Sequence, residues 1–330
     1  MDAEIVLVQS DAGALAPGGW ARLPAIIVAD GEKTAKRFLE FFTANIENPN
    51  TRAAYARAVG YFLDWCHQHK LTLHKIEPIH VAAYRESLNK SYETQTVKQH
   101  LAAIRMLFDW LVTGQSVPSN PASSVKGPKY SYNKGKTPIL DAEGIRQLKN
   151  SIDASTLVGL RDRALVMLMF YSFGRVSAIV GMDVKDYYPR GKQYFIGLQE
   201  KGGKYHEVPV HHKAEEYLDA YLQAAGITDQ KDAPLFRSSK GKTPNVLSAN
   251  RMSRTDVLKM IKRRAKQAGI GENISPHSFR GTGLTIYLEN GGTLENAQKM
   301  AGHASARTTK LYDRTSDQIN RDEVERIPSF

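Results

Sequence analysis

Apolar residues recur every three or four positions between residues 33 and 113 of the chain. That spacing is the period of an amphipathic helix. Pro78 precedes one of the expected starts, where proline is tolerated. We therefore expect a helical domain over residues 32–115, preceded by an N-terminal tail at residues 1–31. Its helices are expected near residues 35–42, 51–66, 79–88 and 97–111, with Asn50 as the cap of the second.

The periodicity stops between Ser116 and Pro138, where proline, glycine, serine and lysine are frequent. Such a composition favours neither a helix nor a central strand. We expect a linker over residues 116–138, and its lysines would suit a segment that lies along a phosphate backbone. A linker that only connects two domains explains the composition equally well.

The second half of the chain mixes helical patterns with one short extended region. Extended segments at residues 194–198 and 206–210 flank Lys-Gly-Gly-Lys at 201–204, which is typical of a β-hairpin. The expected fold is mainly α with a small antiparallel β-sheet, in which an α+β domain at residues 139–316 is followed by a C-terminal tail at residues 317–330. We expect this tail to contact a neighbouring copy of the chain. The helices of this half are expected near residues 141–151, 160–173, 213–225, 255–268, 276–289, 294–300 and 305–315.

Charge and composition narrow the classes of function. The 330 residues include 45 Lys and Arg against 34 Asp and Glu, a formal net charge of +11. The excess is spread over both halves, which favours contact with a polyanion such as nucleic acid. The single cysteine, Cys66, excludes a disulfide framework. The sequence has no apolar run long enough for a membrane span and no basic leader, so we expect a cytoplasmic protein.

A pattern that suits phosphate binding begins near residue 275. The pair Ser275-Pro276 is a helix start, because serine caps a helix and proline is tolerated at its first position. His277 and Arg280 then lie three residues apart, on one face and close to the free N–H groups of the helix. A histidine and an arginine at such a terminus would bind a phosphate and place a proton carrier beside it.

Other polar residues can join this pattern from elsewhere in the chain. Gly302 ends the next expected helix, so His303 would lie in a short elbow and Tyr312 about two turns into the following helix. Arg175 and Lys201, the latter at the hairpin, complete a set that is rich in cations. The sequence shows no carboxylates at metal-ligand spacing around this set and no glycine-rich nucleotide loop. We therefore expect attack on a phosphodiester with no metal and no cofactor.

Four motifs follow one another along the chain. They are Phe-Gly-Arg-Val-Ser, Glu-Lys-Gly-Gly-Lys-Tyr-His-Glu-Val-Pro-Val, Pro-His-Ser-Phe-Arg-Gly-Thr and Ala-Gly-His-Ala-Ser-Ala-Arg-Thr-Thr-Lys-Leu-Tyr. Over residues 33–315 the chain resembles the tyrosine recombinase family, which includes phage integrases and Xer-type recombinases. The resemblance implies a helical core-binding domain that binds DNA, followed by a catalytic domain. It also implies cutting and rejoining of DNA through a 3′-phosphotyrosyl intermediate.

The resemblance gives individual residues their roles. Tyr312 is the implied nucleophile, and Arg175 and Arg280 would clamp the non-bridging oxygens of the scissile phosphate. Lys201 would protonate the leaving 5′ oxygen, with Lys204 of the same hairpin as the alternative.

Two histidines and one missing acid complete the implied site. His277 would handle the tyrosine proton, and His303 would hydrogen-bond the phosphate. Family members usually carry Glu or Asp three residues after the first arginine, whereas this chain has Ala178. The departure concerns the hydrogen bonding around Arg175 and leaves the nucleophile unaffected.

The resemblance further implies a site-specific recombinase or integrase, with a mobile element such as a phage, transposon or plasmid, or the chromosome, as its cargo. It would act as a homotetramer on two double-stranded DNA sites, with accessory DNA-bending proteins as further partners. A type IB topoisomerase, which shares the chemistry, and an inactive DNA-binding relative are the alternatives. The basic residues that we expect to contact DNA are Arg52, Lys98, Arg105, Lys126 and Lys129.

Overall fold

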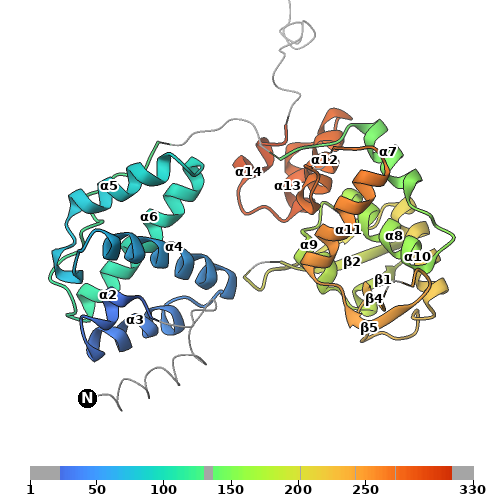
Figure 1. Cartoon of the computed structure of the whole chain (residues 1–330). Helices are drawn as coiled ribbons and strands as arrows, with labels where there is room; N and C mark the ends of the chain where they lie inside the picture. Colours follow the sequence, from blue (N-terminus) through green and yellow to red (C-terminus); the bar gives the residue numbers. More distant parts are fainter. Residues whose placement is uncertain (1–22, 130–136, 201, 242, 272, 314–330) are drawn as a thin grey trace, which may run out of the picture. The chain divides into compact units, whose positions relative to one another are not determined.

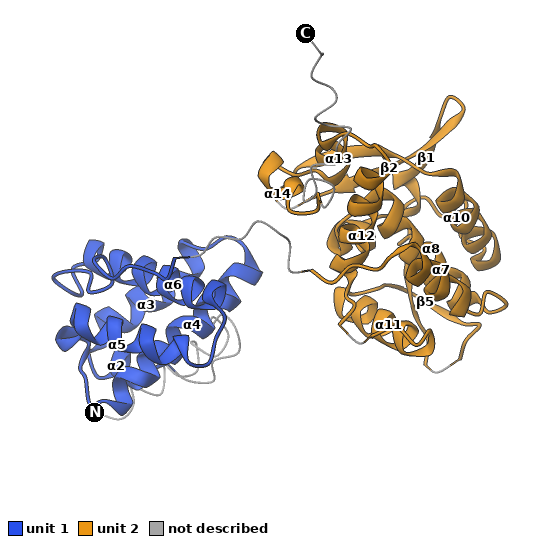
Figure 2. Ribbon diagram, turned by 90° about the horizontal axis from the view of Figure 1, so that it is seen from above, with its two compact units in different colours: residues 1–131 blue, residues 132–330 orange. Residues whose placement is uncertain are grey.

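The computed structural model describes residues 23–129, 137–200, 202–241, 243–271 and 273–313. The chain divides into two compact units, residues 1–131 and 132–330 (Figure 2). Each unit has a hydrophobic core of its own. None of the helices in the described ranges is long and apolar enough to cross a membrane.

The first unit is a bundle of helices, as the periodicity predicted (Figure 1). Its centre is aromatic: Phe62 and Phe108 come from two different helices and meet edge to face, with ring centroids 6.2 Å apart. Both side chains are buried, so they contribute strongly to the core. The elements are α2 (Ala25–Val28), α3 (Glu32–Ala44), α4 (Pro49–Gln68), the 3₁₀ helix η1 (Leu73–Lys75), α5 (Pro78–Asn89) and α6 (Thr94–Thr113).

The cap of α4 lies two residues before the predicted one. The side chain of Asn48 accepts hydrogen bonds from the backbone N–H groups of Asn50 and Thr51, and Pro49 occupies the first helical position. Asn50 is therefore a residue whose N–H needs capping, because the first N–H groups of a helix have no partner within it.

The first unit is also longer than the predicted domain of residues 32–115. Apolar side chains from the predicted tail 1–31 and the predicted linker 116–138 are buried in its core. The composition of these segments did not predict this burial. Proline and serine disfavour helices and strands, but they do not prevent neighbouring apolar side chains from packing into a core. Residues 1–22 of the predicted N-terminal tail, residues 130–136 of the predicted linker and the predicted C-terminal tail at 317–330 lie outside the described residues. The added core residues are Ile26, Ile27, Val117, Ala122 and Val125.

The second unit is built around a buried helix, α8 (Leu157–Ser172), which α10 and α12 contact from the sides. The predicted hairpin is confirmed: β2 and β3 pair antiparallel, with Ile196 opposite Val208, and β1 extends the sheet in the order β1-β2-β3. The other elements are α7 (Ala142–Ser151), α9 (Val176–Gly181), η2 (Val184–Asp186), β1 (Tyr187–Arg190), β2 (Gln193–Gln199), β3 (Tyr205–Pro209), α10 (His212–Ala225), α11 (Arg254–Gln267), α12 (Pro276–Glu289), α13 (Leu294–Ala301) and α14 (Ala306–Lys310).

A second sheet escaped prediction from the sequence. The strands β4 (Arg237–Ser239) and β5 (Leu247–Arg251) pair antiparallel. Both strands are short and largely polar, so neither shows the alternation that marks a half-buried strand.

A buried carboxylate joins several elements of the second unit. Asp162 of α8 is 0% exposed and accepts hydrogen bonds from the guanidinium groups of Arg161 and of Arg264 in α11. Arg161 also donates to the carbonyl oxygen of Arg237 in β4, at 2.8 Å. Because a buried ion is costly unless it is fully paired, this network holds α8, α11 and β4 in one arrangement.

Candidate active site

The start of α12 presents two of the predicted residues. The N–H of Ser275 donates to Oγ of Ser278 at 3.1 Å, and Pro276 is the first residue of the helix. The helix therefore begins where the Ser-Pro pair predicted. His277 and Arg280 lie in its first turns, at the end where free N–H groups favour an anion.

Arg280 is the central cation of the site and is only 1% exposed. Its guanidinium donates to the carbonyl oxygens of Phe173, at the end of α8, and of Ala301, at the end of α13. Its Nε is buried with no hydrogen-bond partner among the described residues. Burial and the nearby charge of Arg175 lower the pKa of Arg280 to about 10, so the group stays charged at neutral pH. A fixed, charged guanidinium with one N–H group still unpaired suits an anionic ligand.

Arg175 lies directly before α9, as its N-terminal cap residue. Its Nη1 forms an ion pair with Oε2 of Glu200, at 2.5 Å. The two side chains differ in exposure, since that of Arg175 is 36% exposed and that of Glu200 only 2%. The buried acid thus holds the guanidinium of a side chain that is partly open to solvent.

Tyr312 meets His277 across the site. Its hydroxyl lies 2.9 Å from Nε2 of His277, and its side chain is mostly buried. The carbonyl oxygen of Tyr312 accepts a hydrogen bond from Thr285 of α12 at 3.1 Å. The sequence placed Tyr312 two turns into a helix, but α14 ends at Lys310 and the tyrosine lies in the turn that follows. This turn brings the phenol back against α12.

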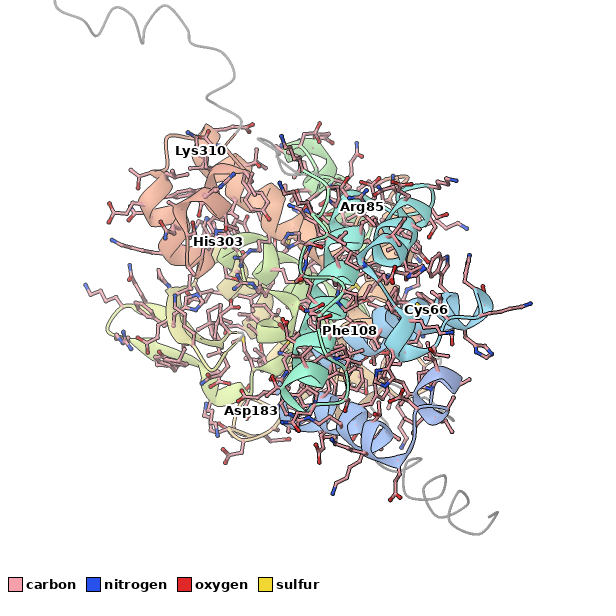
Figure 3. All side chains as sticks on the ribbon, turned by 90° about the vertical axis from the view of Figure 1, so that its left-hand side faces the viewer. Cys66, Arg85, Phe108, Asp183, His303 and Lys310 are labelled. Carbon is pink, nitrogen blue, oxygen red and sulfur yellow. The ribbon has the colours of Figure 1, made fainter. Side chains whose placement is uncertain are left out.

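His303 lies in the predicted elbow between α13 and α14. Gly302 ends α13 in the left-handed conformation, with φ 59°, and Ser305 caps α14. The ring of His303 is nearly parallel to that of Tyr312, with centroids 6.1 Å apart, and its Nδ1 is 2.8 Å from Oγ1 of Thr309. His303 is buried, whereas Lys310 at the end of α14 is at the surface (Figure 3).

Both histidines are neutral at physiological pH. Burial, followed by the charges of Arg280 and Arg175, lowers the pKa of His277 below its ordinary value of 6.5. The same causes lower the pKa of His303 to about 3. A neutral His277 whose Nε2 carries no proton can accept the phenolic proton of Tyr312.

The structure thus brings five of the six predicted catalytic residues together. The sixth, Lys201, lies outside the described residues. The alternative, Lys204, is exposed, and its carbonyl oxygen accepts a hydrogen bond from the N–H of Glu200 at 2.6 Å, which closes the hairpin. The five residues are Arg175, His277, Arg280, His303 and Tyr312.

Glu200 is an ionisable residue of this site that sequence reasoning missed, as it also missed the hydroxyl partners Thr285 and Thr309. Glu200 is next to the predicted catalytic lysine, but in the sequence it directly follows an expected strand and is indistinguishable from an ordinary hairpin residue. The signal that could have found it is the combination of Ala178, where an acid was expected, with an acid at the base of the hairpin.

The predicted DNA contacts lie in the first unit and divide into two kinds. Arg52 donates through Nε and Nη2 to the carbonyl oxygen of Ile46, and Arg105 donates to those of Ala122 and Val125. These two arginines therefore hold backbone segments in place. The exposed residues of the set are Lys98, Lys126 and Lys129.

Comparison with known families agrees with both units. The model of the phage integrase family matches residues 138–318, and that of the phage integrase N-terminal SAM-like domain matches residues 35–115. Tyrosine recombinase XerC of Escherichia coli O157:H7 is 30% identical over 227 residues, covering 68% of this chain and 72% of that protein. Tyrosine recombinase XerD of Listeria monocytogenes is 28% identical over 271 residues, covering 80% and 87%.

Solved structures share the fold at low sequence identity. XerH bound to its difH substrate before cleavage superposes with a TM-score of 0.60 at 20% identity, covering 84% of this chain and 78% of that one. A lambda integrase tetramer bound to a Holliday junction gives a TM-score of 0.66 at 16% identity, covering 96% and 89%. The chain belongs to the phage integrase family and is a site-specific tyrosine recombinase, an enzyme that breaks and rejoins DNA.

Proposed function

We propose that Tyr312 is the nucleophile of this recombinase and that His277 takes its proton. The observation that carries the proposal is the 2.9 Å contact between the Tyr312 hydroxyl and Nε2 of His277. That separation is within the reach of direct proton transfer. The lowered pKa of His277 keeps the ring neutral at pH 7 and therefore able to accept.

The reaction then divides into two similar steps. As the phenolic proton moves to His277, the oxygen of Tyr312 bonds to phosphorus and the bond from phosphorus to the 5′ oxygen breaks. The leaving 5′ oxygen takes a proton, a role that the family resemblance gives to Lys201. The 3′-phosphotyrosine keeps the energy of the phosphodiester, so a 5′ hydroxyl from another strand can reverse the step without ATP.

The arginines stabilise the charge that develops on the phosphate. Arg280 keeps its charge at neutral pH and has a buried Nε with no partner within the described ranges. The side chain of Arg175 is partly open to solvent. Two fixed guanidinium groups can bind the non-bridging oxygens without a metal ion, and they need little rearrangement as the reaction proceeds. His303 would add a hydrogen bond to the same phosphate.

A nicked DNA duplex tests the nucleophile. Cleavage of this substrate next to the nick releases a short fragment, so the covalent complex accumulates and survives denaturation. We expect the wild-type protein to form the complex with or without EDTA, and the Tyr312→Phe protein to bind DNA and form none. Tyr287→Phe, on α12, is the matched control and should form the complex normally. A covalent complex on the Tyr312→Phe protein would identify a different nucleophile.

One face of the first unit is proposed to contact the DNA backbone. Arg85 of α5 donates to the carbonyl oxygen of Lys126 at 3.0 Å, and a Cβ added at Gly127 would lie 3.7 Å from the side chain of Lys98 on α6. The cations of two helices and of the segment after α6 therefore lie on a common face. Lys129 extends it.

Salt dependence tests this face. Each lost phosphate contact should make the slope of log affinity against log salt shallower by about 0.9. We expect this change for Lys98→Glu and Lys126→Glu, with weaker binding. Lys75→Glu in η1 makes the same charge change before the start of α5 and should leave the slope unaltered. Equal slopes for all three variants would reject the face.

The tetramer is proposed by analogy with the lambda integrase assembly. The second unit carries an apolar pocket of about 720 Å³, and the segment 317–330 includes Ile327 and Phe330. We expect this segment of one copy to enter the pocket of its neighbour. Deleting residues 317–330 should then abolish recombination between two sites and spare cleavage of one site, and unchanged recombination would reject the contact. The pocket is lined in part by Phe170, Phe173, Ile286, Tyr287 and Met300.

A further inference from the structure

Glu200 is a buried acid among the cations of the active site. Its side chain is 2% exposed, and Oε2 forms an ion pair with Nη1 of Arg175. The other carboxylate oxygen, Oε1, is buried with no hydrogen-bond partner within the described part of the chain. A buried carboxylate with one oxygen unpaired is costly, and such groups are frequent at functional sites.

The backbone of Glu200 is held in place by the sheet. It directly follows β2, and its N–H donates to the carbonyl oxygen of Lys204 at 2.6 Å, across the base of the hairpin. The carboxylate therefore has a defined position, set by strand pairing. Arg175 is attached to it from the start of α9.

The bond to Glu200 is the one hydrogen bond that the Arg175 side chain makes among the described residues. Ala178, one helical turn along α9, has no polar side chain and is buried. A long arginine side chain has many rotamers, and a single anchor removes much of that freedom.

We propose that Glu200 is the positioning residue that orients Arg175 for the scissile phosphate, in place of the acid that the family carries where this chain has Ala178. The inference rests on the proposed role of Arg175 in binding that phosphate. Charge supports it as well: Arg175 lowers the pKa of Arg280, whereas Glu200 raises it. The acid thus offsets the repulsion between two neighbouring guanidinium groups.

Single-turnover cleavage of the nicked duplex tests the proposal in a double-mutant cycle. The variants are Arg175→Ala, Glu200→Ala and the two combined, with Glu200→Gln as a variant that keeps the shape and removes the charge. We expect Glu200→Ala to slow cleavage by up to about a hundredfold, the scale of a misplaced catalytic group, and to leave DNA affinity nearly unchanged. Glu200→Gln should lose less, because its amide oxygen can still accept a hydrogen bond from Arg175.

The cycle separates a positioning role from a structural one. If Glu200 acts through Arg175, the double variant should cleave no more slowly than Arg175→Ala alone. Glu207→Gln, on β3 of the same sheet and paired with Arg190 at 2.7 Å, is the matched control and should cleave normally.

Three results have different meanings. Normal cleavage by both Glu200 variants would overturn the inference, and so would additive losses in the double variant. Normal cleavage by Arg175→Ala would instead remove the proposed role of Arg175, on which the inference depends. If Glu200→Ala does not fold, Glu200→Gln takes its place in the cycle, and its loss of rate must again vanish in the Arg175→Ala background.

Discussion

Replacing His277 with alanine tests the proton transfer most directly, because it removes the group that contacts the Tyr312 hydroxyl at 2.9 Å. A positioned general base contributes about 10²- to 10⁴-fold to a rate, which corresponds to roughly 3 to 5 kcal/mol of the activation barrier. The cleavage rate of the His277→Ala protein should fall by that factor. DNA binding should change little, since Arg175 and Arg280 remain.

The pH dependence of the cleavage rate gives a second test, because it shows which protonation state of His277 is active. The neutral ring is the form that accepts the proton, and the pKa of His277 is lowered below 6.5 by burial and by Arg280 and Arg175. The wild-type rate should therefore decline at acidic pH, with the midpoint of the decline below the ordinary histidine value of 6.5. His303, with a pKa lowered to about 3, stays neutral through this range.

The assay is single-turnover cleavage of the nicked duplex over a series of pH values, with DNA binding measured at each. The decline at acidic pH should disappear in the His277→Ala protein, because the group that titrates is gone. A decline of the same midpoint in that variant would show that another group titrates. A loss of less than about tenfold would show that His277 contributes little as a base.

Two further predictions concern the packing that supports the site. Gly302→Ala should lower stability by about 1–2 kcal/mol, because alanine is strained in the left-handed backbone conformation of this position. It should also slow cleavage, because the added Cβ would lie 2.9 Å from the His206 ring. Gly226→Ala, with a similar φ and open space around it, should lose only stability, and equal cleavage rates for the two variants would contradict this prediction. Asp162→Ala should lower the free energy of unfolding, measured in urea, by about 3–5 kcal/mol, because it leaves the charges of buried arginines unpaired. Glu216→Ala, which breaks an exposed ion pair with Lys213, should lower it by less than about 1 kcal/mol. Similar losses in both variants would refute the role of the buried network.

The sequence alone determined those features that depend on near neighbours. The helix from Pro276 to Glu289 begins and ends where it was predicted, because a Ser-Pro pair acts within one turn. Gly302 ends α13 for a similar local reason, since glycine adopts a positive φ without strain. The family motifs could also be recognised from the sequence alone, because each is a short run of neighbouring residues whose types suit one chemistry.

Tertiary structure decided the features that depend on distant parts of the chain. The position of Tyr312 in a turn after α14 depends on Thr285 of α12, which binds its carbonyl oxygen. Arg105 holds the segment after α6, although its charge predicted a DNA contact. In both cases a buried or half-buried polar group must find a partner, and that partner is far away in the sequence.

The pairing of Glu200 with Arg175 is the clearest example. The sequence showed the missing acid at Ala178, and the replacement lies 22 residues further on, at the base of a hairpin. Helical spacing could not reveal it, because the contact is made between the start of α9 and the end of β2. Only the packing of the sheet against α9 brings that carboxylate to the arginine, and burial then makes the ion pair necessary.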